Sequence, residues 1–250
     1  MKRLKTLVIF TLCIFTLLSC GIEELLFLPQ VPENSIRSVK TSEVYITLPA
    51  LTESYATGYI IYYKIYIIST AYETIPELIT TTSVTSRIAS DYNFFRTYID
   101  PTNTSSIPSL NTFKGKGFYE LELEKSNIRN TVLSTSGGSF NIQFPLADGI
   151  INKPYINTAD NPIYRSTDGG AFNPKPTGAG YRYFFSSPEM NDYANAIPTV
   201  NADVSGQSGV SEFAYVSMYI VAVGTQQDKG NFSRLYGKPT FIGIFKLPKQ

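Results

Sequence analysis

The run of residues 59–68, YIIYYKIYII, constrains the fold more than any other part of this sequence. Nine of its ten residues are tyrosine or isoleucine, and the tenth is Lys64. A helix needs about 20 apolar residues to cross a bilayer, whereas aromatic and β-branched residues favour strands. The run therefore predicts a β-strand and not a transmembrane helix.

The two faces of this strand differ, because alternate side chains of a strand point to opposite sides. One face is wholly apolar or aromatic, and we expect it to lie in the core: Tyr59, Ile61, Tyr63, Ile65 and Ile67. The other face places one lysine among apolar residues: Ile60, Tyr62, Lys64, Tyr66 and Ile68. This second face is too apolar to be left bare, so we predict that a long insertion or a partner covers it.

Strand patterns dominate the rest of the chain from residue 36 onward. Alternating or β-branched runs lie at 42–51, 116–125, 139–146, 213–224 and 240–247. No long segment keeps a helical period, and the best helix prediction is a short one at 186–197 with Ser187 as its cap. Many strands without alternating helices predict an all-β fold, a sandwich or a barrel.

Two pairs of these segments resemble a known family of sandwiches. EVYITLPAL and TGYIIYYKIYI look like strands B and C of fibronectin type III and related immunoglobulin-like domains, and VSMYIVAVGTQ and GKPTFIGIFKL look like strands F and G. The chain has no tryptophan, so Tyr45 or Ile46 would replace the family's core tryptophan on strand B. The resemblance implies an antiparallel β-sandwich.

Some 140 residues separate the C-like and F-like strands, which implies a long insertion. Residues 147–180 are dense in Gly, Pro, Asn, Asp and Thr, which favour turns. We therefore expect one sandwich over 36–250 with a loop-rich insertion at about 147–211. The alternative is two sandwiches with a boundary near residue 150.

The first twenty residues have the order of a secretory signal: a basic start, an apolar run and then Ser19 and Cys20. LLSC at 17–20 resembles the lipobox of bacterial lipoproteins, with Leu18 where that family prefers a smaller residue. The resemblance implies that residues 1–19 are removed and that Cys20 carries an S-diacylglycerol and an N-palmitoyl group. Residues 20–35 would then be a lipidated tether or, for part of that run, a first edge strand.

The composition excludes several kinds of chemistry. The chain has no histidine, and its two cysteines lie in the signal and at the lipidation position, so Ser-His-Asp and Cys-His sites and zinc sites built on these residues are excluded. Loss of the signal takes the formal net charge from +1 to about −2, and no basic patch indicates nucleic acid. We predict no cofactor, no metal and no enzymatic activity.

Two groups of side chains merit attention as sites. Glu120, Glu122 and Glu124 share one face of a predicted strand, and we interpret that face as solvated. Four aromatic residues are predicted to lie in loops, where they would bind a partner or fix the loops to the sandwich: Tyr155, Tyr164, Phe172 and Tyr236.

Three functional hypotheses remain open. The first is a lipid-anchored cell-envelope module that presents loops to a protein or glycan partner. The second is a structural or assembly lipoprotein of the periplasm, and the third is a glycan hydrolase with two paired carboxylates. Gly21, in place of an aspartate after Cys20, implies the outer membrane by the same resemblance, on either its periplasmic or its outer face.

Overall fold

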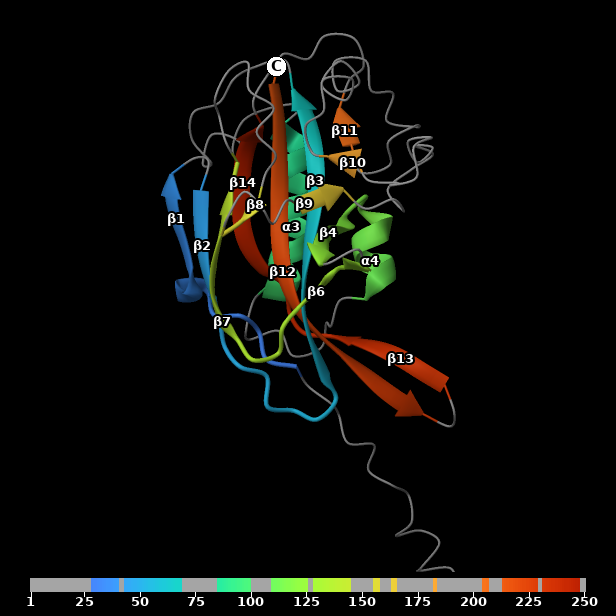
Figure 1. Ribbon diagram of the computed structural model, residues 1–250. Coiled ribbons are helices and arrows are strands. Elements are labelled where there is room, and N and C mark those ends of the chain that lie inside the picture. The colour runs from blue at the N-terminus through green and yellow to red at the C-terminus, as the bar shows by residue number, and fades with distance from the viewer. Residues whose placement is uncertain are drawn as a thin grey trace, which may run out of the picture.

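Two packed β-sheets and two helices make up the part of the chain that the computed structural model describes (Figure 1). The described residues are 28–40, 43–68, 85–99, 109–125, 128–144, 155–157, 163–165, 182–183, 204–206, 213–228 and 231–247. The predicted helix at 186–197, Cys20 and the signal segment lie outside them.

The smaller sheet has four antiparallel strands in the order β1-β2-β7-β8. Its strands are β1 (Ile36–Lys40), β2 (Glu43–Leu48), β7 (Gly138–Gln143) and β8 (Tyr155–Ile156), and a short 3-10 helix, η1 (Glu33–Ser35), precedes them. The alternation of β2 directs Val44, Ile46 and Leu48 inward and leaves Tyr45 exposed. Of the two residues, Ile46 is therefore a core residue and Tyr45 is not.

The larger sheet follows the order β10-β9-β4-β3-β12-β13. These strands are β10 (Arg182–Tyr183), β9 (Ile163–Arg165), β4 (Tyr119–Lys125), β3 (Ala56–Ile68), β12 (Phe213–Asp228) and β13 (Asn231–Tyr236). Four further strands pair with this path: β14 (Thr240–Leu247) with β12, β5 (Ile128–Asn130) with β4, and β6 (Val132–Leu133) and β11 (Val204–Gly206) with β3. The pairs on the main path are antiparallel, and β11 is parallel to β3.

The hydrophobic core lies between the two sheets and confirms the sandwich-like, mostly β architecture. Side chains of β2 and β7 pack there against the inward faces of β3, β12 and β14. Four side chains on the face of β3 that we predicted to be buried are at most 2% exposed: Tyr59, Ile61, Tyr63 and Ile65. The side chain of Ile67 is not among those described.

The predicted insertion contributes strands to both sheets. β8 pairs with β7, β9 pairs with β4, and β11 pairs with β3. In addition, β3 pairs with β12 along most of its length. Strands from both sides of residue 150 thus share hydrogen bonds within each sheet.

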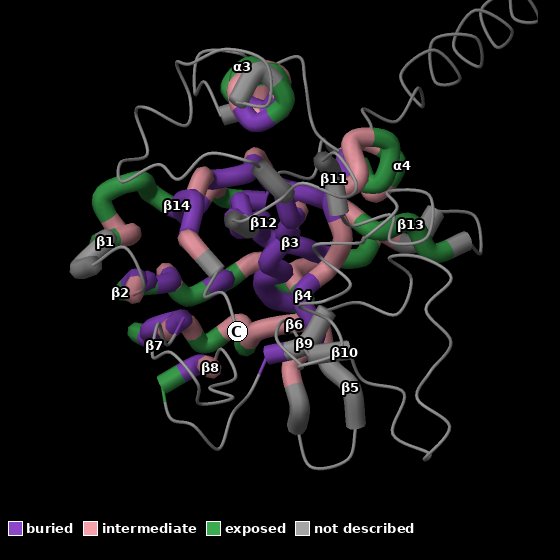
Figure 2. Tube along the Cα trace, turned by 90° about the horizontal axis from the view of Figure 1, so that it is seen from above, coloured by how far each residue is buried: buried purple, intermediate pink, exposed green. Residues whose placement is uncertain are grey.

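Two helices cover the outer face of the larger sheet, α3 (Thr85–Ile99) and α4 (Leu110–Gly115). Figure 2 shows them on the side of β3 and β12 away from β2 and β7. They pack on a second cluster that contains Ile60 and Tyr62. The second face of β3 is therefore covered, as we expected. The cover consists of α3 and α4, whereas we predicted the insertion at 147–211 or a partner. No helix was predicted in that region.

The described part of the predicted tether packs into the domain. Leu28 and Val31 are buried core residues. The Thr240 hydroxyl donates to the Val31 carbonyl at 2.6 Å, and the Gln30 side chain donates to the Pro239 carbonyl at 3.0 Å. A chain anchored at Cys20 therefore has only residues 21–27 between its anchor and its core.

Candidate functional site

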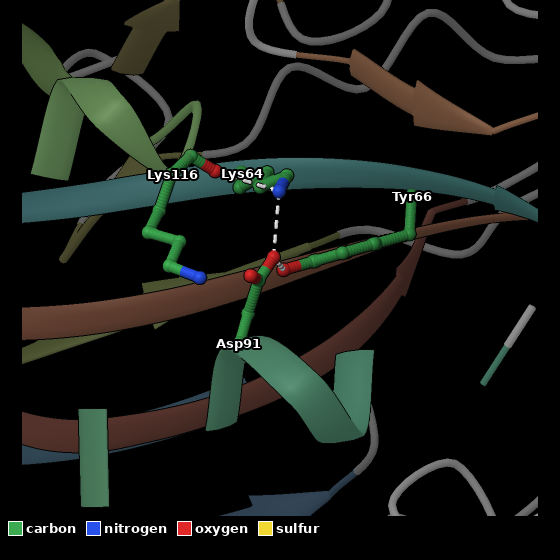
Figure 3. Close-up of polar contacts among 4 residues, drawn as sticks. All are labelled: Lys64, Tyr66, Asp91 and Lys116. Carbon is green, nitrogen blue, oxygen red and sulfur yellow. Dashed lines mark hydrogen bonds and ion pairs between the residues drawn. The ribbon is translucent and has the colours of Figure 1, made fainter. Parts of the chain in front are cut away.

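Two polar sites lie on the helix-covered face of the larger sheet. The first is a buried cluster that joins β3 to α3 (Figure 3). The Lys64 ammonium donates to Asp91 Oδ2 at 2.6 Å and to the Lys116 carbonyl at 2.6 Å, and the Tyr66 hydroxyl donates to the same Asp91 oxygen at 2.8 Å. The Lys64 and Asp91 side chains are 12% and 10% exposed.

The electrostatics of this cluster indicate a structural role. Burial lowers the pKa of Lys64, and the Asp91 carboxylate opposes that shift. Burial, and then Asp91, raises the pKa of Tyr66 well above its ordinary value. The Lys64 ammonium also lies 5.2 Å from the Tyr66 ring centre and 5.5 Å from that of Phe118. Protein groups surround the cation, so the cluster fixes α3 to the sheet.

The second site is a pocket of about 230 Å³ between α4, β4 and β13. Its aromatic and apolar lining residues are buried or partly buried, and its charged side chains come from α4, β4 and β13. The lining residues are Tyr62, Leu110, Lys114, Phe118, Tyr119, Glu120, Glu122, Thr131 and Arg234. This pocket is the candidate ligand site.

Local sequence explains why α4 and β4 stand beside each other. Ser109 caps α4 through a reciprocal pair of hydrogen bonds with Thr112, the capping-box arrangement. Gly117 adopts φ 73°, a left-handed conformation that suits glycine and ends the helix. The Phe118 N–H then donates to the Phe113 carbonyl at 2.9 Å, and β4 begins at Tyr119.

The alternation of β4 supplies the acidic side of the pocket. Leu121 lies in the core between the sheets, whereas Glu120 and Glu122 point to the helix side and line the pocket. Glu122 is 6% exposed. The prediction that this face is solvated is therefore wrong for both residues, because α4 and β13 cover it. The side chain of Glu124 is outside the described set.

Glu120 is held by two donors that reach it from β13 and β3. The Arg234 guanidinium donates to Glu120 Oε1 at 2.5 Å, and the Tyr62 hydroxyl donates to the same oxygen at 3.2 Å. Burial acts to lower the pKa of Arg234, but Glu120 and Tyr236 outweigh it and raise that pKa. Burial, and then Glu120, raises the pKa of Tyr62 well above its ordinary value. The pocket thus contains an oriented carboxylate and guanidinium.

Three of the four aromatic residues predicted to lie in loops fall within the described part of the chain, and each of them lies on a different strand. Tyr155 lies in β8 and donates to the Gln143 side chain, Tyr164 lies in β9, and Tyr236 is a buried residue of β13 near Tyr62. The loop prediction is wrong for these three, because short strands form within the turn-rich segment and at the end of the chain. Phe172 lies outside the described residues.

Sequence reasoning missed Lys114 and Arg234, the two cations of the pocket. Arg234 is an exposed residue of β13 between exposed Ser233 and half-buried Leu235. This local pattern gives no sign of a site. Among the described residues, no group of three or more His, Cys, Asp or Glu side chains is placed to hold a metal ion.

Comparisons with protein-family models, with curated proteins and with solved structures found no match for this chain. Neither of the two described helices combines the length and the apolar character that crossing a bilayer requires.

Proposed function

We propose that this chain is a lipid-anchored binding protein of a bacterial cell envelope, without enzymatic activity, and that its ligand site is the α4-β4-β13 pocket. The single observation that carries the binding role is this pocket, which two carboxylates and two cations from three elements line together with aromatic and apolar residues. Concave sites with a few convergent polar groups are where small ligands bind.

The lipobox-like LLSC motif and Cys20 support the anchor. The seven residues 21–27 extend no further than about 25 Å at 3.3–3.6 Å per residue. Because Leu28 already lies in the core, such an anchor holds the domain close to the bilayer surface. We place it at the outer membrane, on its periplasmic or its outer face.

The order of the strands supports an immunoglobulin-like or fibronectin type III-like sandwich as the finer description of the fold. Such domains place strands A, B and E in one sheet and C, F and G in the other. Here β1, β2 and β7 are neighbours in one sheet, and β3, β12 and β14 are neighbours in the other. β8 occupies the place of strand D next to β7, although it follows β7 in the chain.

A binding role fits the pocket better than hydrolysis. A carboxylate-based hydrolase needs one carboxyl group that carries a proton to its leaving group. Glu120 instead accepts hydrogen bonds from Arg234 and Tyr62 on the same oxygen, so this carboxyl group is already engaged within the protein. We therefore propose that the pocket binds its ligand without cleaving it, and detection of glycan cleavage would contradict this proposal.

The test uses the detergent-solubilised full-length mature protein and its Arg234→Ala variant. Thermal unfolding is followed with a panel of single amino acids, dipeptides and amino sugars. A ligand at 100 times its dissociation constant adds about 2.7 kcal/mol to the stability of the folded state. We expect at least one compound to raise the Tm of the wild type and not that of the variant. A panel in which no compound separates the two proteins contradicts the proposed site, and release of sugar products would replace binding by hydrolysis.

A further inference from the structure

We infer that the α4-β4-β13 pocket takes a small zwitterion, an amino acid or a dipeptide with a free ammonium group and a free carboxylate. This inference rests on the proposed function and narrows it to one chemical class of ligand.

The charges of the pocket are of both signs and balanced. Glu120 and Glu122 line it from β4, while Lys114 and Arg234 line it from α4 and β13. Burial of a charge is costly unless an opposite charge compensates it. A ligand with only one sign of charge would compensate one pair of residues and oppose the other. A zwitterion can direct its ammonium group to the carboxylates of β4 and its carboxylate to the two cations.

The bonds within the site leave groups that suit such a ligand. Both described hydrogen bonds to Glu120 end on Oε1, and the second carboxylate oxygen, Oε2, has the capacity to accept from an ammonium group. Arg234 contacts Glu120 through Nη1, and a guanidinium carries five N–H donors, more than that contact uses. Lys114 is an exposed residue of α4 and lines the pocket.

The size of the pocket limits the ligand. Pockets for drug-sized ligands occupy about 300–1,000 Å³, and this one occupies about 230 Å³. The partly buried Leu110 and the buried Phe118 contribute apolar surface beside the charges, which fits short aliphatic side chains. We therefore expect a ligand of one or two residues.

The test is isothermal titration calorimetry of the detergent-solubilised mature protein with L-alanyl-L-alanine. The matched probes are its N-acetyl derivative, its C-terminal amide and N-acetylglucosamine. We expect the dipeptide to bind, and each blocked form to bind at least about tenfold more weakly, because each loses one charge-assisted contact. Blocked forms that bind as tightly as the free dipeptide overturn the inference.

Variants locate the binding. We expect Glu120→Gln and Arg234→Ala to weaken dipeptide binding at least about tenfold. Exposed residues with the same charges on the other side of the sandwich, Glu33 and Arg37, provide the controls, and Glu33→Gln and Arg37→Ala should bind as the wild type does. Circular dichroism confirms that each variant is folded. Equal binding by Arg234→Ala and Arg37→Ala overturns the assignment to this pocket.

The outcomes separate this inference from the function on which it rests. If N-acetylglucosamine binds in an Arg234-dependent way and the dipeptide does not, the zwitterion is wrong and the binding function stands. If no amino acid, dipeptide or sugar binds the wild type, both are wrong.

Discussion

The Lys64 ammonium lies 2.6 Å from the carboxylate of Asp91, and this contact joins the centre of β3 to the middle of α3. Both side chains are nearly buried, and Tyr66 donates to the same carboxylate oxygen. The one charged residue of an otherwise apolar and aromatic strand face is thus compensated by a helix of the same chain. The pair explains how a lysine can occupy that face and how α3 is held in place.

Removal of Asp91 should strongly destabilise the fold. Asp91→Ala leaves the Lys64 ammonium buried without its carboxylate, which typically costs about 3–5 kcal/mol. Urea unfolding should show this loss in the free energy of unfolding. The control is Asn93→Ala, an exposed position of the same helix, which should stay within about 0.5 kcal/mol of the wild type. Equal stability of the two variants would show that α3 does not depend on this pair.

Replacement of both partners should be much milder than replacement of one. Apolar residues in place of a buried ion pair are often neutral for stability. We expect the Lys64→Met, Asp91→Leu double variant to unfold at a higher urea concentration than Asp91→Ala. A double variant less stable than Asp91→Ala would instead indicate that the polar contacts have a role beyond compensation of charge.

Four tyrosines should make the fold sensitive to alkali. Burial raises the pKa of Tyr59 to about 12 and also raises those of Tyr62, Tyr66 and Tyr219 well above their ordinary value. Because these pKa values exceed the unfolded value of 10.0, the stability they contribute is complete below pH 10 and is lost as pH rises above it. The lowered pKa of Lys64 acts in the opposite direction up to about pH 10.5, but it is one group against four.

Tyrosinate absorbance and unfolding, followed together from about pH 9 to about pH 12, test this prediction. We expect the exposed tyrosines to ionise first and the rest to ionise only as the protein unfolds. Complete ionisation of all eighteen tyrosines in a protein that remains folded would contradict the burial of these four.

Gly58 should not tolerate a side chain. Its φ is +145°, and a Cβ there would lie 2.0 Å from the carbonyl oxygen of Leu133 on β6. Gly58→Ala should cost at least about 1–3 kcal/mol, measured by urea unfolding. Gly115 at the end of α4 is the matched control, since a Cβ there would meet nothing within 4 Å. A cost for Gly115→Ala as large as that for Gly58→Ala would contradict the pairing of β3 with β6.

The anchor is tested by metabolic labelling of cells with a fatty acid. The wild-type protein should incorporate the label, and Cys20→Ala should not. The control is Cys13→Ala, because Cys13 lies in the apolar run and would be removed with the proposed signal. Incorporation of label into Cys20→Ala would contradict the lipid attachment at this residue.

The strands and the core face of β3 could be predicted from the sequence, because both follow from a local two-residue alternation. The helix α3 could not. Its buried positions Ile88, Asp91 and Phe95 follow a helical spacing, but a carboxylate interrupts the apolar pattern at its centre. Asp91 is compatible with burial only through Lys64, 27 residues away, a relationship that no local pattern contains.

The pocket was missed for a similar reason. The alternation of β4 correctly separates Leu121 from Glu120 and Glu122, but it cannot distinguish a face open to water from a face beneath a helix and a hairpin. Arg234 lies 114 residues from Glu120 and meets it only through the pairing of β3 with β12 and of β12 with β13. The charged residues of the site thus converge only in the folded chain.

Backbone amide chemical shifts of the isotope-labelled protein, recorded during titration with L-alanyl-L-alanine, test the ligand site most directly. We expect the shifts to stay constant in β1 and β8 and to change around the pocket, at Leu110, Lys114, Glu120, Glu122, Thr131 and Arg234. Changes centred on β1 and β8, or no changes at all, would contradict the assignment of this pocket as the ligand site.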